Sequence, residues 1–345
     1  MNSFAIGVDL GGTNLRIAAV DTAGKVLEKI STNAQVARGR EYILDEMCKS
    51  IRALAARFGD TGGLIGIGIG VPGIIDKQRG VVRESPNLPD WRDYPVHDEI
   101  MQRLQTDVSL ENDANAAALG EKWLGIGGGF DDVCMLTLGT GVGGGIVLKG
   151  RIWHGMTGMA GEMGHITVEP RGIRCGCGNW GCLEQYASAT AIKRMAVEAI
   201  ARGEAPELAK AMDQDPEFSA KGVYDFAVQG DEAARRIFHV VGQSLGIALA
   251  SLINIFNLPM YIIGGGVSHA WDAFSPSMLE QVRQRSFVYA ATAPSGTAID
   301  HRRNMADGGG KSTIITRAAL GSDAGLLGAA RLPMIVSERV SERAR

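Results

Sequence analysis

Residues 4–21, FAIGVDLGGTNLRIAAVD, contain two apolar runs that are separated by the turn sequence GGTN at positions 11–14. Within these runs apolar side chains recur at about every second position, which is the period of a half-buried β-strand. The stretch at 133–148, VCMLTLGTGVGGGIVL, repeats the pattern around the turn GTG at 139–141. Two half-chains that each begin with a strand, a glycine-rich turn and a returning strand predict a duplicated α/β unit with the ligand held between the copies.

The rest of the chain alternates between helical and extended patterns. A length of 345 residues favours about two domains. We expect one α/β domain from residues 1–115 plus 318–345 and a larger one from 116–317. Helical spacing predicts helices at 42–58, 114–124, most of 189–260 and 318–332, with a solvated tail from Ser337, and buried apolar runs predict strands at 64–71, 108–111 and 261–263.

Composition and charge exclude several classes of protein. The hydrophobic share of 45% and the charged share of 21% are typical of a globular chain. With 35 basic and 38 acidic residues the net charge is −3, so nothing favours nucleic acid or an anionic membrane as a partner. No run of ~18 apolar residues and no signal peptide stands out, which predicts a cytoplasmic protein without membrane spans.

Glycine is the unusual component, at 47 of 345 residues. Two matches to the pattern GxGxxG, at 68–73 and 139–144, raise the possibility of a dinucleotide-binding fold. We reject it because that fold needs a helix after the glycines, whereas here strands follow. A glycine turn between strands is either a plain hairpin or a phosphate cradle formed by converging backbone N–H groups. Two copies favour the cradle.

Two aspartates lie next to these elements. Asp9 directly precedes the first glycine turn and could hold Mg²⁺ through water. Asp113 follows a strand and precedes a helix, where it would be either an N-cap or a general base for an alcohol substrate. A capping box would place Glu or Gln at position 116, which is Ala116. Together with a phosphate site, the general base is the preferred interpretation.

Three clustered cysteines give the most specific signal in the chain. Cys175, Cys177 and Cys182 follow His165 within a glycine-containing loop. This spacing predicts a tetrahedral Cys₃His zinc site in the loop 165–182, rather than unrelated free thiols. With four protein ligands no position is left for water, so the zinc is expected to be structural.

Two glutamates flank the zinc motif. Glu162 lies three residues before His165, and Glu184 lies two residues after Cys182. Carboxylate and amide side chains suit a sugar, because each hydroxyl both donates and accepts a hydrogen bond. The second ring nitrogen of His165 could face the same ligand.

These motifs resemble the signatures of the ROK family (repressors, open reading frames, kinases), and most closely those of its bacterial glucokinases. The resemblance runs from about residue 4 to about residue 332. It rests on DLGGTN at 9–14, ENDANAA at 111–117, LGTGVGGG at 138–145, GEMGH at 161–165 and CGCGNWGCLE at 175–184.

The resemblance implies a duplicated actin-like, hexokinase-type (ribonuclease H-like) two-domain α/β fold with an interdomain cleft. It also implies Mg-ATP-dependent phosphorylation of D-glucose at O6, a structural zinc ion, and a homodimer or larger homo-oligomer. By matching position, Asp113 is the expected catalytic base, and the expected sugar ligands are Asn112, Asp113, Glu162, His165 and Glu184. The nucleotide and its Mg²⁺ are expected at Asp9, Gly11, Gly12, Thr13, Thr140, Gly141, Gly265 and Gly266, and zinc at His165, Cys175, Cys177 and Cys182.

Several alternatives remain open on the sequence. Another ROK kinase would act on N-acetylmannosamine, N-acetylglucosamine, fructose or allose, and polyphosphate could replace ATP. A ROK repressor without its DNA-binding domain is disfavoured by the absence of a basic arm. Two departures from the glucokinase pattern are Gln185, where threonine is expected, and a long polar stretch at 293–312.

Overall fold

The computed structural model describes residues 3–59, 63–85, 87–294 and 312–343. The chain divides into two compact units. Unit 1 consists of Met1–Asp131, Gly145–Gly161 and Ala319–Arg345, and unit 2 consists of Asp132–Gly144 and Glu162–Ala318. The domain boundaries expected from the sequence, at 115/116 and 317/318, stay a prediction.

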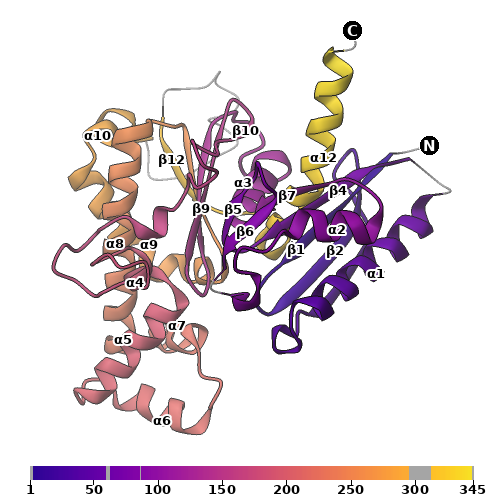
Figure 1. Ribbon diagram of the computed structural model, residues 1–345. Coiled ribbons are helices and arrows are strands. Elements are labelled where there is room, and N and C mark those ends of the chain that lie inside the picture. The colour runs from indigo at the N-terminus through magenta and orange to yellow at the C-terminus, as the bar shows by residue number, and fades with distance from the viewer. Residues whose placement is uncertain (1–2, 60–62, 86, 295–311, 344–345) are drawn as a thin grey trace. The chain divides into compact units, whose positions relative to one another are not determined.

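The first sheet has five strands in the order β3-β2-β1-β4-β7, and Figure 1 labels β2, β1, β4 and β7. Strands β1, β2 and β3 are joined antiparallel as a meander, whereas β4 and β7 run parallel to β1. The strands are β1 (Phe4–Leu10), β2 (Asn14–Asp21), β3 (Val26–Asn33), β4 (Leu64–Val71) and β7 (Val108–Asn112).

The second sheet repeats this plan, with the order β10-β9-β8-β11-β12. Its first three strands are again antiparallel, and β11 and β12 again run parallel to the strand that begins the hairpin. The strands are β8 (Val133–Leu138), β9 (Val142–Leu148), β10 (Arg151–Ile152), β11 (Met260–Gly264) and β12 (Ile314–Arg317). The predicted duplication of an α/β unit is confirmed by this identical strand order.

Helices cover the sheets. Unit 1 contributes α1 (Arg40–Gly59), α2 (Val96–Leu104), α3 (Asp113–Trp123) and α12 (Ala324–Arg343), together with a small hairpin of β5 (Ile74–Asp76) and β6 (Val81–Glu84). Unit 2 contributes α4 (Glu184–Ala187), α5 (Ala189–Ala201), α6 (Pro206–Gln214), α7 (Ala220–Gln229), α8 (Glu232–Phe256), α9 (Trp271–Arg285) and α10 (Phe287–Thr292).

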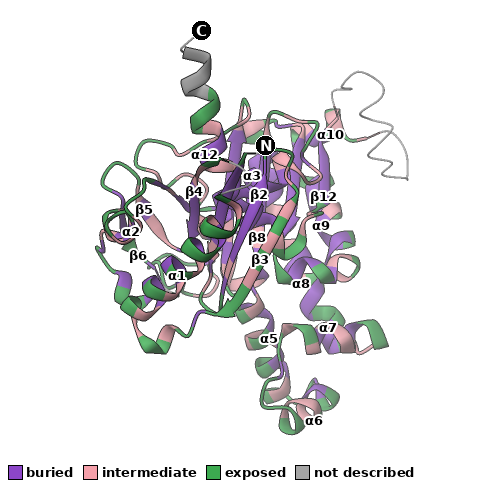
Figure 2. Ribbon diagram, turned by 90° about the vertical axis from the view of Figure 1, so that its right-hand side faces the viewer, coloured by how far each residue is buried: buried purple, intermediate pink, exposed green. Residues whose placement is uncertain are grey.

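The alternation of glycine and isoleucine in β4 explains how the first sheet packs. Ile67 and Ile69 join the apolar core that also contains the inward side of α1. On the other face, a Cβ at Gly66 would lie 2.7 Å from Pro333, and one at Gly68 would overlap the carbonyl of Ala329. Glycine therefore lets α12 lie directly on the backbone of β4, whose last five residues are buried (Figure 2).

Helix α8 is the one described helix with the length and apolar composition of a membrane span. However, 67% of its most apolar window is buried inside the structure, as in the core helix of a globular protein. Gly242 and Gly246 bring its backbone against α9, because a Cβ at either position would overlap that helix. Polar residues interrupt the apolar positions of this helix, so its sequence contains no continuous apolar run of the length of a membrane span.

The C-terminal segment differs from the prediction. The last helix begins at Ala324 rather than at 318, since β12 and a short 3₁₀ turn come first. It also continues past Pro333 to Arg343, so the tail from Ser337 is helical, although Ser337 and Glu338 are exposed as expected of a solvated end. Arg331 and Glu338, two turns apart on this helix, form a bidentate ion pair of 2.7 and 2.9 Å that supports the extension. Most of the polar stretch at 293–312 lies outside the described residues.

Candidate active site

The predicted site residues fall into two groups, one in each unit. In unit 1 they gather where three neighbouring parallel strands end. Asp9 of β1 and Glu111 of β7 are both register partners of Gly70 on β4. At about 4.8 Å per strand, the backbones of Asp9 and Glu111 are about 10 Å apart along one edge of the sheet. Gly70 also faces Asp113, whose Cα would lie 3.7 Å from an added Cβ.

The glycine turn at 11–13 closes the hairpin of β1 and β2. The N–H of Gly11 donates to the carbonyl of Asn14 at 2.8 Å, and the carbonyl of Thr13 accepts from Ala34 at 2.8 Å. Gly12 and Thr13 are exposed. The turn is thus fixed at both ends, and its tip is open to solvent, as a phosphate cradle requires.

Asp9 has a cationic neighbour across the hairpin. Arg16 donates to Asp9 Oδ2 at 3.2 Å and to the carbonyl of Ser322 at 3.1 Å. Burial raises the pKa of Asp9, and the charge of Arg16 lowers it by less. At the start of α12, a Cβ on Gly325 would lie 3.1 Å from Asp9 Oδ1. The carboxylate is therefore held in a narrow space beside a guanidinium group.

The junction between β7 and α3 shows which residue caps the helix. Asn112 Oδ1 accepts from the N–H groups of Ala114 at 2.9 Å and Asn115 at 3.1 Å, and its Nδ2 donates to the carbonyl of Gly73 at 3.0 Å. Asn112 is therefore the N-cap. Asp113 is the first residue of the helix, and its Oδ1 accepts from the N–H of Ala114 at 2.9 Å.

In unit 2, the structure brings the two predicted nucleotide segments together. Gly265 has φ +82°, and a Cβ there would overlap the backbone of Leu138, which directly precedes the turn at 139–141. A side chain at position 265 would thus be excluded by both the backbone conformation and the close approach. Thr140 and Gly141 consequently lie near Gly265 and Gly266.

The segment that follows the cysteine motif is hydrogen-bonded to the turn at 139–141 and to the residue after it. Glu184 Oε2 accepts from the N–H of Val142 at 3.0 Å. The N–H of Ala189 donates to the carbonyl of Gly139 at 2.8 Å, and Thr190 Oγ1 donates to the carbonyl of Thr140 at 2.8 Å. This contact was not predicted, because nothing in the sequence links residues about 50 positions apart.

The four predicted zinc ligands converge. Their donor atoms all lie within 4.8 Å of one another, with 3.7 Å between the sulfurs of Cys177 and Cys182 and 3.7 Å between Cys175 Sγ and His165 Nδ1. A tetrahedral zinc with bonds of about 2.0–2.3 Å requires ligand atoms about 3.6–3.8 Å apart. The donor set therefore fits Zn²⁺ in its chemistry, and the two pairs at 3.7 Å match the spacing of a tetrahedral site.

His165 uses its two ring nitrogens in different directions. Nδ1 faces the cysteine cluster, and Nε2 lies 3.9 Å from Glu162 Oε2. Burial raises the pKa of Glu162, the charge of His165 opposes this rise, and Glu184 adds to it. Glu162, His165 and Glu184 therefore form one electrostatically coupled group beside the cysteines.

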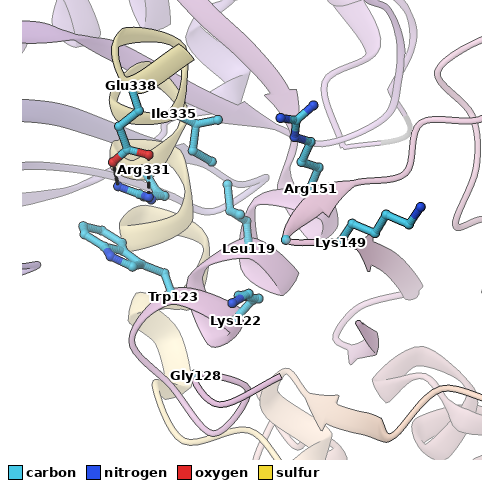
Figure 3. A pocket seen from close by; sticks show the side chains of 10 residues that line it. Leu119, Lys122, Trp123, Gly128, Lys149, Arg151, Arg331, Ile335 and Glu338 are labelled. Atoms are coloured by element: carbon cyan, nitrogen blue, oxygen red, sulfur yellow. Dashed lines mark hydrogen bonds and ion pairs between the residues drawn. The ribbon is translucent and has the colours of Figure 1, made fainter. Parts of the chain in front are cut away.

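A separate cavity of about 370 Å³ lies in unit 1 (Figure 3). Its lining contains none of the predicted site residues. Arg331 is engaged by Glu338, and Lys122 lies 3.3 Å from Asp131. The side chains of Lys149 and Arg151 point in different directions in Figure 3, so the cations do not converge on one point.

Comparison with known proteins gives the family. The ROK family model matches residues 5–334. A glucokinase of Thermotoga maritima is 40% identical over 336 residues, which are 97% of this chain and 98% of that protein. A xylose repressor of Caldicellulosiruptor bescii is 34% identical over 284 residues, which are 82% of this chain and 71% of the repressor.

A solved structure bears out the fold. A ROK family glucokinase from Streptomyces griseus, in complex with glucose and AMPPNP, is 36% identical to this chain. The match covers 95% of this chain and 98% of that one, with a TM-score of 0.71. The predicted hexokinase-type, actin-like α/β fold is confirmed by this similarity. Because the family model spans nearly all of the sequence, the chain belongs to the ROK family.

Proposed function

We propose that the protein is a glucokinase that transfers the γ-phosphoryl group of ATP to O6 of D-glucose. Its high identity to glucokinases over nearly the whole chain supports this activity. The observation in the structure that carries the proposal is the junction of β7 and α3. There Asn112 supplies the helix cap, and the carboxylate of Asp113 stands at the edge of the sheet that also carries Asp9 and the turn at 11–13.

Asp113 acts as the general base. It accepts the proton of the O6 hydroxyl while O6 bonds to the γ-phosphorus, and the bond from that phosphorus to the β–γ bridging oxygen breaks to release ADP. The N-terminus of α3 favours negative charge on Asp113 before the transfer. Asn112 assists by holding the start of the helix in place.

The nucleotide is bound by main-chain donors. N–H groups of Gly11, Gly12 and Thr13 and of Thr140 and Gly141 donate to phosphate oxygens, and Gly265 and Gly266 leave room for the adenosine. Asp9 orients the hydrated Mg²⁺ that accompanies ATP. When bound, that ion neutralises charge on the β- and γ-phosphates.

The sugar is recognised by hydrogen-bonding side chains of Asn112, Asp113, Glu162, His165 and Glu184. None of them is suited to packing against an acetamido methyl group, so glucose is preferred over N-acetylated hexosamines. His165, Cys175, Cys177 and Cys182 hold a structural zinc ion, which stabilises the loop that carries these side chains. We also place the enzyme in the cytoplasm as a homodimer or larger homo-oligomer that does not bind nucleic acid.

A sugar panel tests the assignment against other ROK kinases. The values of kcat/KM with ATP are compared for glucose, mannose, N-acetylglucosamine and N-acetylmannosamine, and polyphosphate is tried as a second donor. Glucose should give the highest value, with mannose weaker and both N-acetyl sugars lowest. If an N-acetyl sugar exceeds glucose, the protein is a ROK kinase of different specificity.

A further inference from the structure

Glu111 is a buried carboxylate that the proposed mechanism does not use. It is the residue of β7 immediately before Asn112 and Asp113, and only 1% of its surface is exposed. A buried charge is costly unless hydrogen bonds satisfy it. The contacts of its two oxygens show how this cost is met.

One oxygen faces the catalytic junction. Glu111 Oε1 accepts from the backbone N–H of Asn112 at 3.0 Å and from Asn115 Nδ2 at 3.1 Å. Asn115 lies in the first turn of α3. This oxygen therefore links the last residue of β7 to the first turn of the helix, with Asp113 between the two contacts.

The other oxygen contacts the side chains of Lys77 and His154, which come from distant parts of the chain. Glu111 Oε2 accepts from His154 Nε2 at 2.7 Å and pairs with the ammonium group of Lys77. Lys77 Nζ and His154 Nε2 are 3.0 Å apart. Lys77 directly follows β5, and His154 follows β10, so the carboxylate ties both segments to the end of β7.

Packing reinforces the same arrangement. Gly158, in the loop after His154, has φ +88°, and a Cβ there would lie 2.8 Å from the carbonyl of Ile75 in β5. The loop that carries His154 thus lies directly on the hairpin that leads to Lys77. Burial raises the pKa of Glu111, but the hydrogen bond from His154 and the charge of Lys77 outweigh it, so the pKa is lowered. The carboxylate is ionised and has four partners.

We propose that Glu111, held by Lys77 and His154, is a positioning residue that fixes the junction carrying Asn112 and Asp113 for phosphoryl transfer. This inference rests on the proposed role of Asp113. Glu111 Oε1 contacts Asn112 and Asn115, which lie on either side of Asp113 in the chain. Displacement of the Glu111 carboxylate would therefore let the start of α3 move. A displacement of about 1 Å in a catalytic group can cost about 10²-fold in rate.

The charge is essential to this role. Glutamine at position 111 has the same shape, but one of its two terminal atoms is an NH₂ group. In either orientation of the amide this group would oppose two donors, either Asn112 N–H with Asn115 Nδ2 or Lys77 with His154. Glu111→Gln should therefore disturb the junction even though it creates no cavity.

The test uses variants of the two partners, which are each about one-third exposed, together with conservative controls. Lys77→Met and His154→Leu should lower kcat for glucose by about 10-fold or more, while the KM for ATP stays within about twofold. Lys77→Arg and His154→Gln keep a donor and should recover most of kcat. If the first two variants keep near-normal kcat, or lose only melting temperature, the proposal is overturned.

A double variant separates this proposal from the function on which it rests. Because Glu111 acts through Asp113, Glu111→Gln should lower kcat strongly in the wild-type background and add little in the Asp113→Asn background. Equal effects in both backgrounds would refute the positioning role. If Asp113→Asn itself keeps near-normal kcat, the proposed base is wrong and this inference falls with it. Should Glu111→Gln not fold, the same cycle is run with His154→Leu.

Discussion

Gly141→Ala should weaken glucose binding, although residue 141 is predicted to contact only the nucleotide. An added Cβ would meet Glu184 Oε2 at a separation well under the 3.0 Å that real Cβ contacts observe. The oxygen has to move by about 0.6 Å, which displaces the carboxylate and disturbs its 3.0 Å hydrogen bond from Val142 N–H.

The magnitude follows from the role proposed for Glu184 as a sugar ligand. A displaced Glu184 carboxylate loses its hydrogen bond to a glucose hydroxyl. Hydrogen bonds to charged groups contribute about 1.5–3 kcal/mol, so the Kd for glucose should rise by about 10- to 100-fold. Calorimetric titration with glucose, without nucleotide, measures this directly. Gly139→Ala is the matched control, because its Cβ would meet nothing within 4 Å. An unchanged Kd in Gly141→Ala, or equal losses in both variants, would show that residue 141 does not affect glucose binding through Glu184.

Three further predictions concern catalysis, metal and nucleotide. Asp113→Asn should fold and bind glucose but turn over at least ~10²-fold more slowly, and a near-normal kcat in a coupled assay would reduce Asp113 to a structural residue. Metal analysis should find about one zinc per chain. Cys177→Ser should lose the zinc and have a lower melting temperature. Active wild-type enzyme without zinc would contradict the Cys₃His site. Thr190→Val should raise the KM for ATP a few-fold by removing the bond to Thr140, with Thr190→Ser as the control, and a rise in the KM for glucose alone would count against this contact.

Local pattern was sufficient to predict much of the fold. The alternation in residues 4–21 and its repeat in 133–148 predicted both hairpins and the duplication, because strand period and turn glycines are local properties. Strand order was not accessible, since period identifies a strand but not its neighbour. Strand β12 was missed because it is only four residues long and follows a long polar stretch.

The sequence also predicted some features of the candidate site and not others. The Cys₃His cluster could be predicted because three of its residues are close in the sequence, and the structure brings the four donor atoms together. The cap was harder to predict. Asn112 and Asp113 are both favourable N-caps, and only the hydrogen bonds of Asn112 Oδ1 distinguish them.

Contacts between distant segments were beyond prediction. Glu111 meets Lys77 and His154, which are 34 and 43 residues away in the sequence. Lys77 in a turn and His154 after a short strand belong to no sequence motif, so the sequence does not indicate that they meet Glu111. Similarly, Thr190 meets Thr140 only because α5 begins beside the hairpin.

Identifying the reaction product shows whether the protein phosphorylates glucose at O6. Purified protein is incubated with ATP, Mg²⁺ and D-glucose, ADP release is followed, and the phosphorylated sugar is assigned by ³¹P NMR. We expect glucose 6-phosphate and ADP in equal amounts, with at least ~10²-fold less of both from Asp113→Asn. ADP release that does not depend on glucose, or a phosphate at a position other than O6, would rule out the proposed glucokinase activity.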